Sequence, residues 1–233
     1  MKIEKLSLII PVYNEEKTIE KVLNEILKIK YPIKREIIIV DDCSKDKTLK
    51  IINKIAKTNK EIIIKKHEKN SGKGSAIRTG LNASKGTIIG IQDADREYNP
   101  EEHLKLIKPI IQKKEKIVYG SRFLGKKKIQ GKTLFYLGNK FLSFLTSLLY
   151  GQKITDMETC YKFYKKECLK NIQLKGQGFE IEPEITAKFL KRGFKIKEIP
   201  IKYNPRSTDE GKKIKIIDGL TAVWILFKER LLF

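Results

Sequence analysis

Residues 86–100 read Gly-Thr-Ile-Ile-Gly-Ile-Gln-Asp-Ala-Asp-Arg-Glu-Tyr-Asn-Pro. The apolar run within this stretch has strand character, and Pro100 prevents the strand from continuing. Because residues i and i+2 point the same way in an extended chain, Asp93 and Asp95 converge at the strand's end, with Glu97 two residues further on. One interpretation is a solvated acidic turn. The other is a site for a hard divalent cation, Mg²⁺ or Mn²⁺, because such ions prefer all-oxygen ligands and relieve the repulsion between carboxylates.

Three earlier apolar segments, 6–12, 35–40 and 61–65, also have strand character. Each of these predicted strands is followed by a stretch typical of a helix. After the first and second strands, apolar residues recur at helical spacing, and after the third strand a helix is expected to begin within 70–76. Ser44 is a candidate cap for the second of these helices. Alternation of strands and helices with short links predicts an α/β protein with a mostly parallel central sheet covered by helices.

Polar clusters follow four of the predicted strands, and ligands of such sheets lie beyond the carboxyl ends of the strands. We therefore expect these four loops to face one crevice. Gly72-Lys73-Gly74 has neither the Walker nor the Gly-x-Gly-x-x-Gly spacing, so a tight turn explains its glycines, while Lys73 would suit a metal-bound diphosphate. The clusters are 13–15, 41–42, 72–74 and 93–97.

Composition limits the classes of function. At 233 residues the chain suits one domain, and three cysteines without a Cys-x-x-Cys pair argue against disulfides and zinc and favour a reducing cytoplasm. The first residues enter a strand without an apolar signal region, so we expect no secretion. A net charge of +22 suits phosphorylated substrates or an anionic membrane surface. Nucleic acid is disfavoured, because the sequence has no helix-turn-helix, zinc-finger or aromatic RNA-binding pattern.

Four motifs occur in order: Pro11-Val-Tyr-Asn-Glu-Glu16, Val40-Asp-Asp-x-Ser-x-Asp46, Asp93-Ala-Asp95 and Gly120-Ser-Arg-Phe123. Together they resemble glycosyltransferase family 2, in the branch of dolichol-phosphate mannosyltransferases and bacterial polyprenyl-phosphate sugar transferases. The match covers most of the chain, and the series is far more specific than any one motif. The resemblance implies a GT-A fold, which is a Rossmann-like fold. It also implies a nucleotide-sugar donor, a divalent metal and inversion at the anomeric carbon.

Roles for individual residues follow from the resemblance. Asp93 and Asp95 would bind the metal, Mg²⁺ or Mn²⁺, and the diphosphate, with Glu97 as a third ligand at a position where relatives often have Gln. Asp42 would face the base or ribose. The residues expected around the nucleotide and its diphosphate are Pro11, Tyr13, Glu15, Val40, Asp42, Lys73 and Ala94.

The second half of the chain offers cations for an acceptor phosphate. A phosphate monoester, with a second pKa of about 6, can attack without a general base. Arg122 and Arg206 could hold its oxygens as forks, with Lys132 and Lys212 as added charges. A hydroxyl acceptor would instead need a base, for which Asp156 or Glu158 is the candidate. The structural alternative is that Asp156 fixes a loop beside Arg122 or Arg206. His67 and His103 fit no pattern, and we expect both to be exposed to solvent.

Two apolar segments, 134–150 and 220–233, are shorter than the roughly 20 residues that a membrane-spanning helix needs. Each can lie on a bilayer or pack against the core. Given the net charge of +22, we expect attachment to an anionic surface.

The combined hypothesis is one glycosyltransferase domain over 1–233, with a nucleotide-sugar half at 1–118 and an acceptor half at 119–233. It would be a metal-dependent inverting enzyme that moves mannose or glucose, from GDP-mannose or UDP-glucose, to a polyprenyl phosphate of the dolichyl type. We expect it to be peripheral on the cytoplasmic face of the membrane, with a membrane partner protein or as a homo-oligomer. The alternatives are transfer to a hydroxyl of a cell-surface glycan with Asp156 as base, and a non-catalytic module that binds membranes or nucleic acid.

Overall fold

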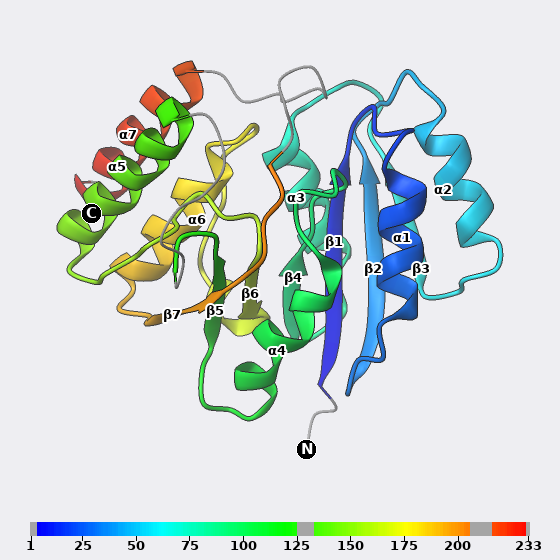
Figure 1. The fold of residues 1–233 in the computed structure, drawn as a ribbon, viewed down its shortest axis with the longest axis horizontal. Coiled ribbons are helices and arrows are strands. Elements are labelled where there is room, and N and C mark those ends of the chain that lie inside the picture. The colour runs from blue at the N-terminus through cyan, green and yellow to red at the C-terminus, as the bar shows by residue number, and fades with distance from the viewer. Residues whose placement is uncertain (1–3, 125–132, 206–215, 232–233) are drawn as a thin grey trace.

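The computed structural model describes residues 4–124, 133–205 and 216–231, which form a sheet flanked by helices (Figure 1). The strands are β1 (Lys5–Val12), β2 (Lys34–Asp41), β3 (Ile62–Lys66), β4 (Ile88–Ile91), β5 (Ile117–Ser121), β6 (Lys162–Lys165) and β7 (Ile196–Pro200). The α-helices are α1 (Ile19–Lys28), α2 (Thr48–Ala56), α3 (Lys73–Ala83), α4 (His103–Ile111), α5 (Thr133–Tyr150), α6 (Ile181–Lys191) and α7 (Ile216–Leu231). Two 3-10 helices are η1 (Pro100–Glu102) and η2 (Lys166–Leu169).

The strands lie in the order β3-β2-β1-β4-β6-β5-β7. β1 pairs in parallel with β2 and β4, β2 with β3, and β5 with β7. The prediction of a mostly parallel sheet is therefore confirmed. The exception is β6, which runs antiparallel between β4 and β5. The sequence pattern does not indicate β6, because its four residues begin and end with lysine and show no alternation.

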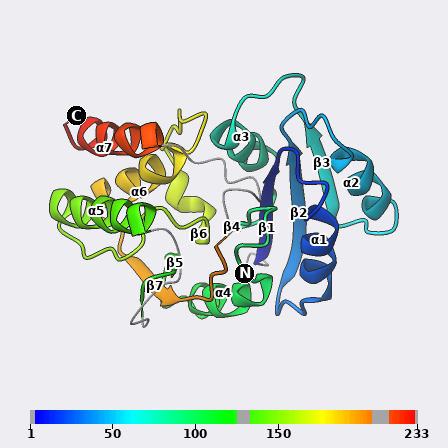
Figure 2. The ribbon, with the colours of Figure 1, turned by 45° about the horizontal axis from the view of Figure 1, so that its top comes forward.

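Helices cover both faces of this sheet. In Figures 1 and 2, α1 and α4 lie on one face, and α3 and α6 lie on the other. α5 and α7 pack against each other and against α6, at the end of the molecule opposite to α2. Among the described residues, no helix is both long enough and apolar enough to cross a membrane.

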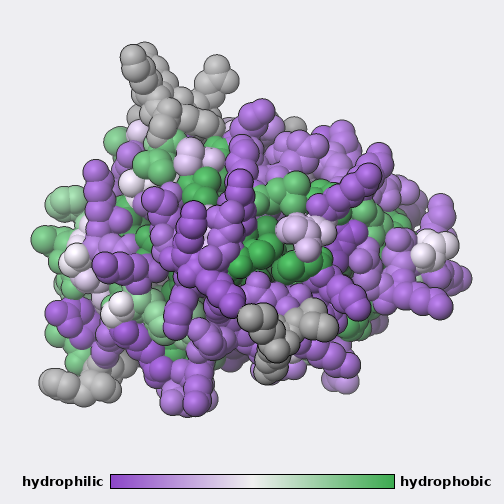
Figure 3. All heavy atoms as spheres, turned by 90° about the horizontal axis from the view of Figure 1, so that it is seen from below, coloured by the Kyte–Doolittle hydropathy of each residue, from purple (hydrophilic) through white to green (hydrophobic). Residues whose placement is uncertain are grey.

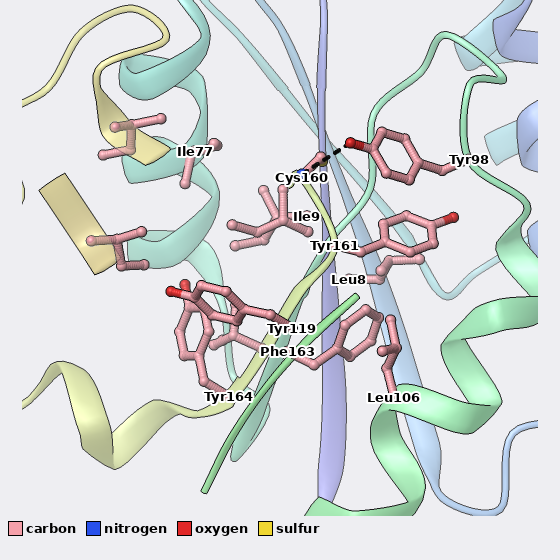
Figure 4. Close-up of a cluster of buried hydrophobic side chains, with 14 of the residues drawn as sticks. Leu8, Ile9, Ile77, Tyr98, Leu106, Tyr119, Cys160, Tyr161, Phe163 and Tyr164 are labelled. Atoms are coloured by element: carbon pink, nitrogen blue, oxygen red, sulfur yellow. Dashed lines mark hydrogen bonds between the residues drawn. The ribbon is translucent and has the colours of Figure 1, made fainter. Parts of the chain in front are cut away.

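The core is densest where β1, β4 and β6 meet. β1 is buried along nearly its whole length because both of its faces are covered. Figure 4 shows the rings of Tyr98 and Tyr161 beside Leu8, with Phe163 further along the same layer. The hydroxyl of Tyr98 accepts a hydrogen bond of 3.3 Å from the backbone N–H of Cys160. This aromatic layer joins the loop after β4 to the loop before β6.

Two sequence expectations about histidines are wrong. His103 is fully buried, with its Nδ1 at 2.6 Å from the hydroxyl of Tyr31. His67 is largely buried, and its ring nitrogens lie 2.7 Å from an oxygen of Asp42 and 2.9 Å from the hydroxyl of Thr79. A lone histidine carries no periodic signal, so its burial depends on tertiary contacts that the sequence does not reveal.

Ser44 is not the cap of α2 either. The helix begins at Thr48, whose N–H donates to Asp46 at 2.9 Å. The hydroxyl of Ser44 instead accepts from the backbone N–H of Asn14 at 3.0 Å, which joins the loops that follow β1 and β2.

Candidate active site

A cavity of about 670 Å³ opens at the carboxyl ends of β1 and β4 and continues between α5 and α7. The predicted polar loops all contribute to its wall. Val40 was predicted to line the cavity but is fully buried against Ile38 and Ala76. Arg206, Lys132 and Lys212 lie outside the described residues. The predicted residues that line the cavity are Pro11, Tyr13, Glu15, Asp42, Lys73, Asp93, Ala94, Asp95, Glu97 and Arg122.

Lys73 links the two halves of the chain inside this cavity. Its ammonium group lies 2.9 Å from Asp93 and 3.1 Å from Glu182, at the start of α6. The second oxygen of Glu182 lies 2.5 Å from the buried ammonium group of Lys162. Burial alone would raise the pKa of Asp93, but Lys73, the hydrogen bond from Cys160 and the charge of Lys162 together hold the pKa below its usual value. Asp93 is therefore ionised, and its carboxylate already lies beside one positive charge, that of Lys73.

Asp95 and Glu97 lie in the turn that follows β4. The chain leaves the strand after Ile91, and Arg96 adopts a positive φ of 60°. The two aspartates thus reach the cavity through a turn, not through the strand alternation that the sequence suggested. The hydroxyl of Tyr203 donates to Glu97 at 2.9 Å, so the turn is connected to the segment after β7.

The acidic set suits a divalent cation in its donor chemistry. Asp93 and Asp95 both line the cavity, and carboxylate oxygens are ligands that Mg²⁺ and Mn²⁺ prefer. Within residues 4–124, 133–205 and 216–231, no three Asp, Glu, His or Cys side chains form a preassembled metal-binding group. Two carboxylates with further oxygens from a diphosphate would complete the ligand set, so the residues present fit such an ion.

Asp42 organises the loop before α3. Its two oxygens accept from the backbone N–H groups of Ser71 at 2.9 Å and of Gly72 at 2.7 Å. Gly72 has a φ of +91°, and a Cβ there would lie 2.4 Å from the carbonyl oxygen of Gln177. Glycine is therefore required, both for the backbone conformation and for the close contact with the second half of the chain.

Arg122 and Asp156 form a buried bidentate pair. The Nε and Nη2 atoms of Arg122 donate to the two oxygens of Asp156 at 2.8 and 2.7 Å, and the backbone N–H of Arg122 adds a third bond of 2.8 Å. Asp156 is fully buried. The carboxylate of Asp156 is thus engaged in holding Arg122, as the alternative expectation for Asp156 stated. Asp156 is therefore poorly placed to act as a base.

Glu158 differs from the other acids of the cavity. Its Oε1 atom is shielded from solvent and has no hydrogen-bond partner. Burial raises the pKa of Glu158 to about 7, although Lys162 and Arg122 act in the opposite direction. A carboxyl group with this pKa carries a proton for much of the time at neutral pH.

Glu182 and Phe179 also line the cavity, although the sequence pattern did not indicate a role for either residue. Both lie in the stretch Gly176-Gln-Gly-Phe-Glu-Ile-Glu182, just before and within the first turn of α6. Acidic residues in a first helical turn are usually explained by the helix dipole, so the pattern alone does not indicate a site. The two glycines followed by alternating acids were the available signal.

Comparisons with known proteins agree with this geometry. The model of "Glycosyl transferase family 2" matches residues 7–173. The chain is 36% identical over 229 residues to a UDP-N-acetylglucosamine–dolichyl-phosphate N-acetylglucosaminyltransferase of Methanococcus voltae, covering 90% of each protein. It is 32% identical over 228 residues to a dolichyl-phosphate beta-glucosyltransferase of Trichomonas vaginalis, covering 91% of this chain and 68% of that protein.

Among solved structures, glucosyl-3-phosphoglycerate synthase of Mycobacterium tuberculosis, in complex with Mn²⁺, UDP and phosphoglyceric acid, has a TM-score of 0.73. It is 18% identical, and the match covers 99% of this chain and 80% of that one, which supports the GT-A fold. The family match spans both aspartates of the acidic turn and most of the sheet. The chain is a glycosyltransferase and belongs to glycosyl transferase family 2.

Proposed function

We propose that the protein transfers a sugar from a nucleoside diphosphate sugar to a polyprenyl phosphate of the dolichyl type, with inversion at the anomeric carbon. The observation that carries this proposal is the shape of the cavity, which joins the acidic turn at Asp93 and Asp95 to an apolar corridor between α5 and α7. A donor diphosphate suits the first end and a lipid chain suits the second. Two relatives at 36% and 32% identity are named as dolichyl-phosphate sugar transferases, which supports the choice of acceptor.

On the donor side, Asp93 and Asp95 would hold Mg²⁺ or Mn²⁺, with Glu97 as a further candidate ligand. When bound, such an ion stabilises negative charge on the leaving diphosphate. Lys73 adds a positive charge at the same place, because its ammonium group already lies against Asp93. Pro11, Tyr13, Glu15 and the loop that Asp42 orders would enclose the nucleoside. Of the expected donors, uridine sugars are favoured, because the N-acetylglucosaminyltransferase relative is named for a UDP-sugar.

On the acceptor side, the corridor begins near Arg122. Asp156 engages Nε and Nη2 of this arginine but not Nη1, and Tyr203 also contacts the guanidinium group, so a phosphate oxygen would approach from the Nη1 side beside Tyr203. Arg206 remains a sequence-based candidate for a second cation. The corridor walls suit an isoprenoid chain, since they include Phe135, Gly138, Phe141 and Leu142 on α5 and Leu220, Ala222 and Val223 on α7.

The same two helices would place the enzyme on an anionic bilayer surface, at its cytoplasmic face. Nine of the ten large hydrophobic side chains that are exposed in the described structure lie on α5 and α7. Figure 3 shows hydrophobic residues at the left margin, where Figure 1 places these helices. A lipid surface is the occupant that suits both this apolar face and the net charge of +22. It would also deliver the lipid acceptor directly to the corridor.

The test is release of nucleoside diphosphate from UDP- and GDP-sugars, with Mn²⁺ or Mg²⁺, and with or without a short polyprenyl phosphate. We expect release to require both the metal and the lipid phosphate. Asp95→Ala should abolish transfer without unfolding the protein, whereas Glu101→Ala, at an exposed acid on η1, should retain it. Substantial activity of Asp95→Ala would contradict the metal assignment, and release without stimulation by lipid phosphate would contradict the acceptor.

A further inference from the structure

Glu158 lies between the proposed acceptor cation and the acidic turn. Two residues before it, Asp156 holds Arg122, and two residues after it, the thiol of Cys160 is hydrogen-bonded to the carboxylate of Asp93. Glu158 itself lines the cavity. Its carboxyl group therefore lies in the part of the wall that connects the proposed acceptor cation Arg122 with Asp93.

Among the described residues, the two cations with the largest influence on Glu158 are already engaged by other acids. The charged groups that influence it most are Lys162, Glu182, Arg122 and Asp156. The ammonium group of Lys162 is engaged by Glu182 at 2.5 Å and by the backbone carbonyl of Met157 at 3.0 Å. Arg122 is engaged by Asp156. Both cations are thus already paired with other acids, while Oε1 of Glu158 has no partner and no contact with solvent.

We propose that Glu158 acts as a carboxylic acid whose other oxygen, Oε2, donates a hydrogen bond to the acceptor phosphate, while Oε1 stays buried. This proposal rests on the proposed phosphate acceptor. A protonated carboxyl group has one O–H to donate, whereas an ionised one can only accept and would repel a phosphate dianion. The pKa of about 7 keeps the acid form available at neutral pH, and the approach of a dianion raises that pKa further. Glu158 would then set an upper pH limit on acceptor binding.

The proposal predicts a specific pH dependence. With the wild-type enzyme, metal and a saturating nucleotide sugar, the KM for a short polyprenyl phosphate should rise above neutral pH, by roughly tenfold for each pH unit once Glu158 is mostly ionised. In Glu158→Gln the side-chain amide donates at every pH, so this alkaline rise in KM should disappear. Glu101→Gln, on the exposed η1, should keep the wild-type profile.

Each outcome has one meaning. A KM for the wild type that stays constant from pH 6 to pH 9 would overturn the proposal, and so would a Glu158→Gln profile that matches the wild type. Complete loss of transfer in a folded Glu158→Gln at every pH would also overturn it, because Glu158 would then act as a base. If polyprenyl phosphate stimulates no variant at any pH, the proposed acceptor itself is wrong, which is a distinct result.

Discussion

Charge neutralisation at single residues explains how this site tolerates so many buried acids. Asp156 is held by Arg122, Glu182 by Lys73 and Lys162, and Asp42 largely by backbone N–H groups. Removing one partner of such a pair leaves a buried charge without compensation, which costs far more than the pair contributes. The arrangement is therefore held in place before any substrate binds.

His103 gives a residue-scale prediction about acid stability. Burial, with a contribution from Arg35, lowers its pKa to about 3 in the folded protein, against about 6.5 in an unfolded chain. Below pH 6.5 the unfolded chain gains a proton that the folded protein does not, so stability falls as the pH decreases toward 3. His103→Gln cannot titrate, and its free energy of unfolding should fall less steeply, by roughly 1.4 kcal/mol per pH unit. Denaturant unfolding between pH 7 and pH 4 measures this difference, and parallel curves would contradict it.

At the scale of elements, the start of α3 is pressed against the loop before α6. A Cβ at Gly74 would lie 2.5 Å from the carbonyl oxygen of Gly176, and the N–H of Gly74 donates to the carbonyl of Gly178 at 3.1 Å. This contact places Lys73, the first residue of α3, beside Glu182. The orientation of one helix thus sets the charge geometry of the site.

Gly74→Ala should therefore lower the stability and disturb the donor site together. The added methyl group meets backbone atoms that cannot move aside easily, so we expect a loss of about 1–3 kcal/mol in the free energy of unfolding. Gly138→Ala on α5 is the matched control, because a Cβ there has no neighbour within 4 Å. That variant should change stability by less than about 1 kcal/mol, in the stabilising direction. Equal effects of the two substitutions in thermal unfolding would refute the role of this contact.

At the scale of the whole molecule, the large exposed hydrophobic side chains of the described residues are concentrated at one end, on α5 and α7. In the described residues, Leu104 on α4 is the large exposed apolar side chain that lies away from α5 and α7. Trp224 and Phe144 are each 65% exposed. A single end of this kind would orient the enzyme on a bilayer, with the corridor directed toward the lipid.

Vesicle binding tests this orientation. Trp224→Ser and Phe144→Ser should each weaken binding to vesicles that contain phosphatidylglycerol by roughly tenfold, because each removes an apolar side chain worth about 1.5–3 kcal/mol when buried. Leu104→Ser should have little effect, and added salt should weaken binding of all variants. If the substitutions leave vesicle binding unchanged but dissociate a dimer, a second copy of the chain covers this face instead.

Features with a local sequence pattern were predicted better than features that depend on contacts between distant residues. Long apolar strands and helices with regular spacing, such as 6–12 and 134–150, were identified because their periodicity is local. The acidic turn was also found, because its loop follows a parallel strand. β6 was not predicted, since it depends on contacts between distant residues. The contact of Asp156 with Arg122 was predicted only as an alternative, because the sequence could not distinguish Arg122 from Arg206 as its partner. Val40 was assigned to the cavity by position in a motif, but neighbouring residues of a strand face opposite sides.

The antiparallel insertion of β6 has a consequence for protein engineering. A chimera of this enzyme with a relative, made to alter the acceptor, would have its junction near residue 119, where the motifs of the donor half end. The incoming segment would also carry β6, which must fit between β4 of the recipient and β5. Gly90 makes that fit tight, because a Cβ there would lie 2.5 Å from the ring of Phe163. A successful chimera must therefore exchange Gly90 and Phe163 as a matched pair, although 72 residues lie between them in the sequence.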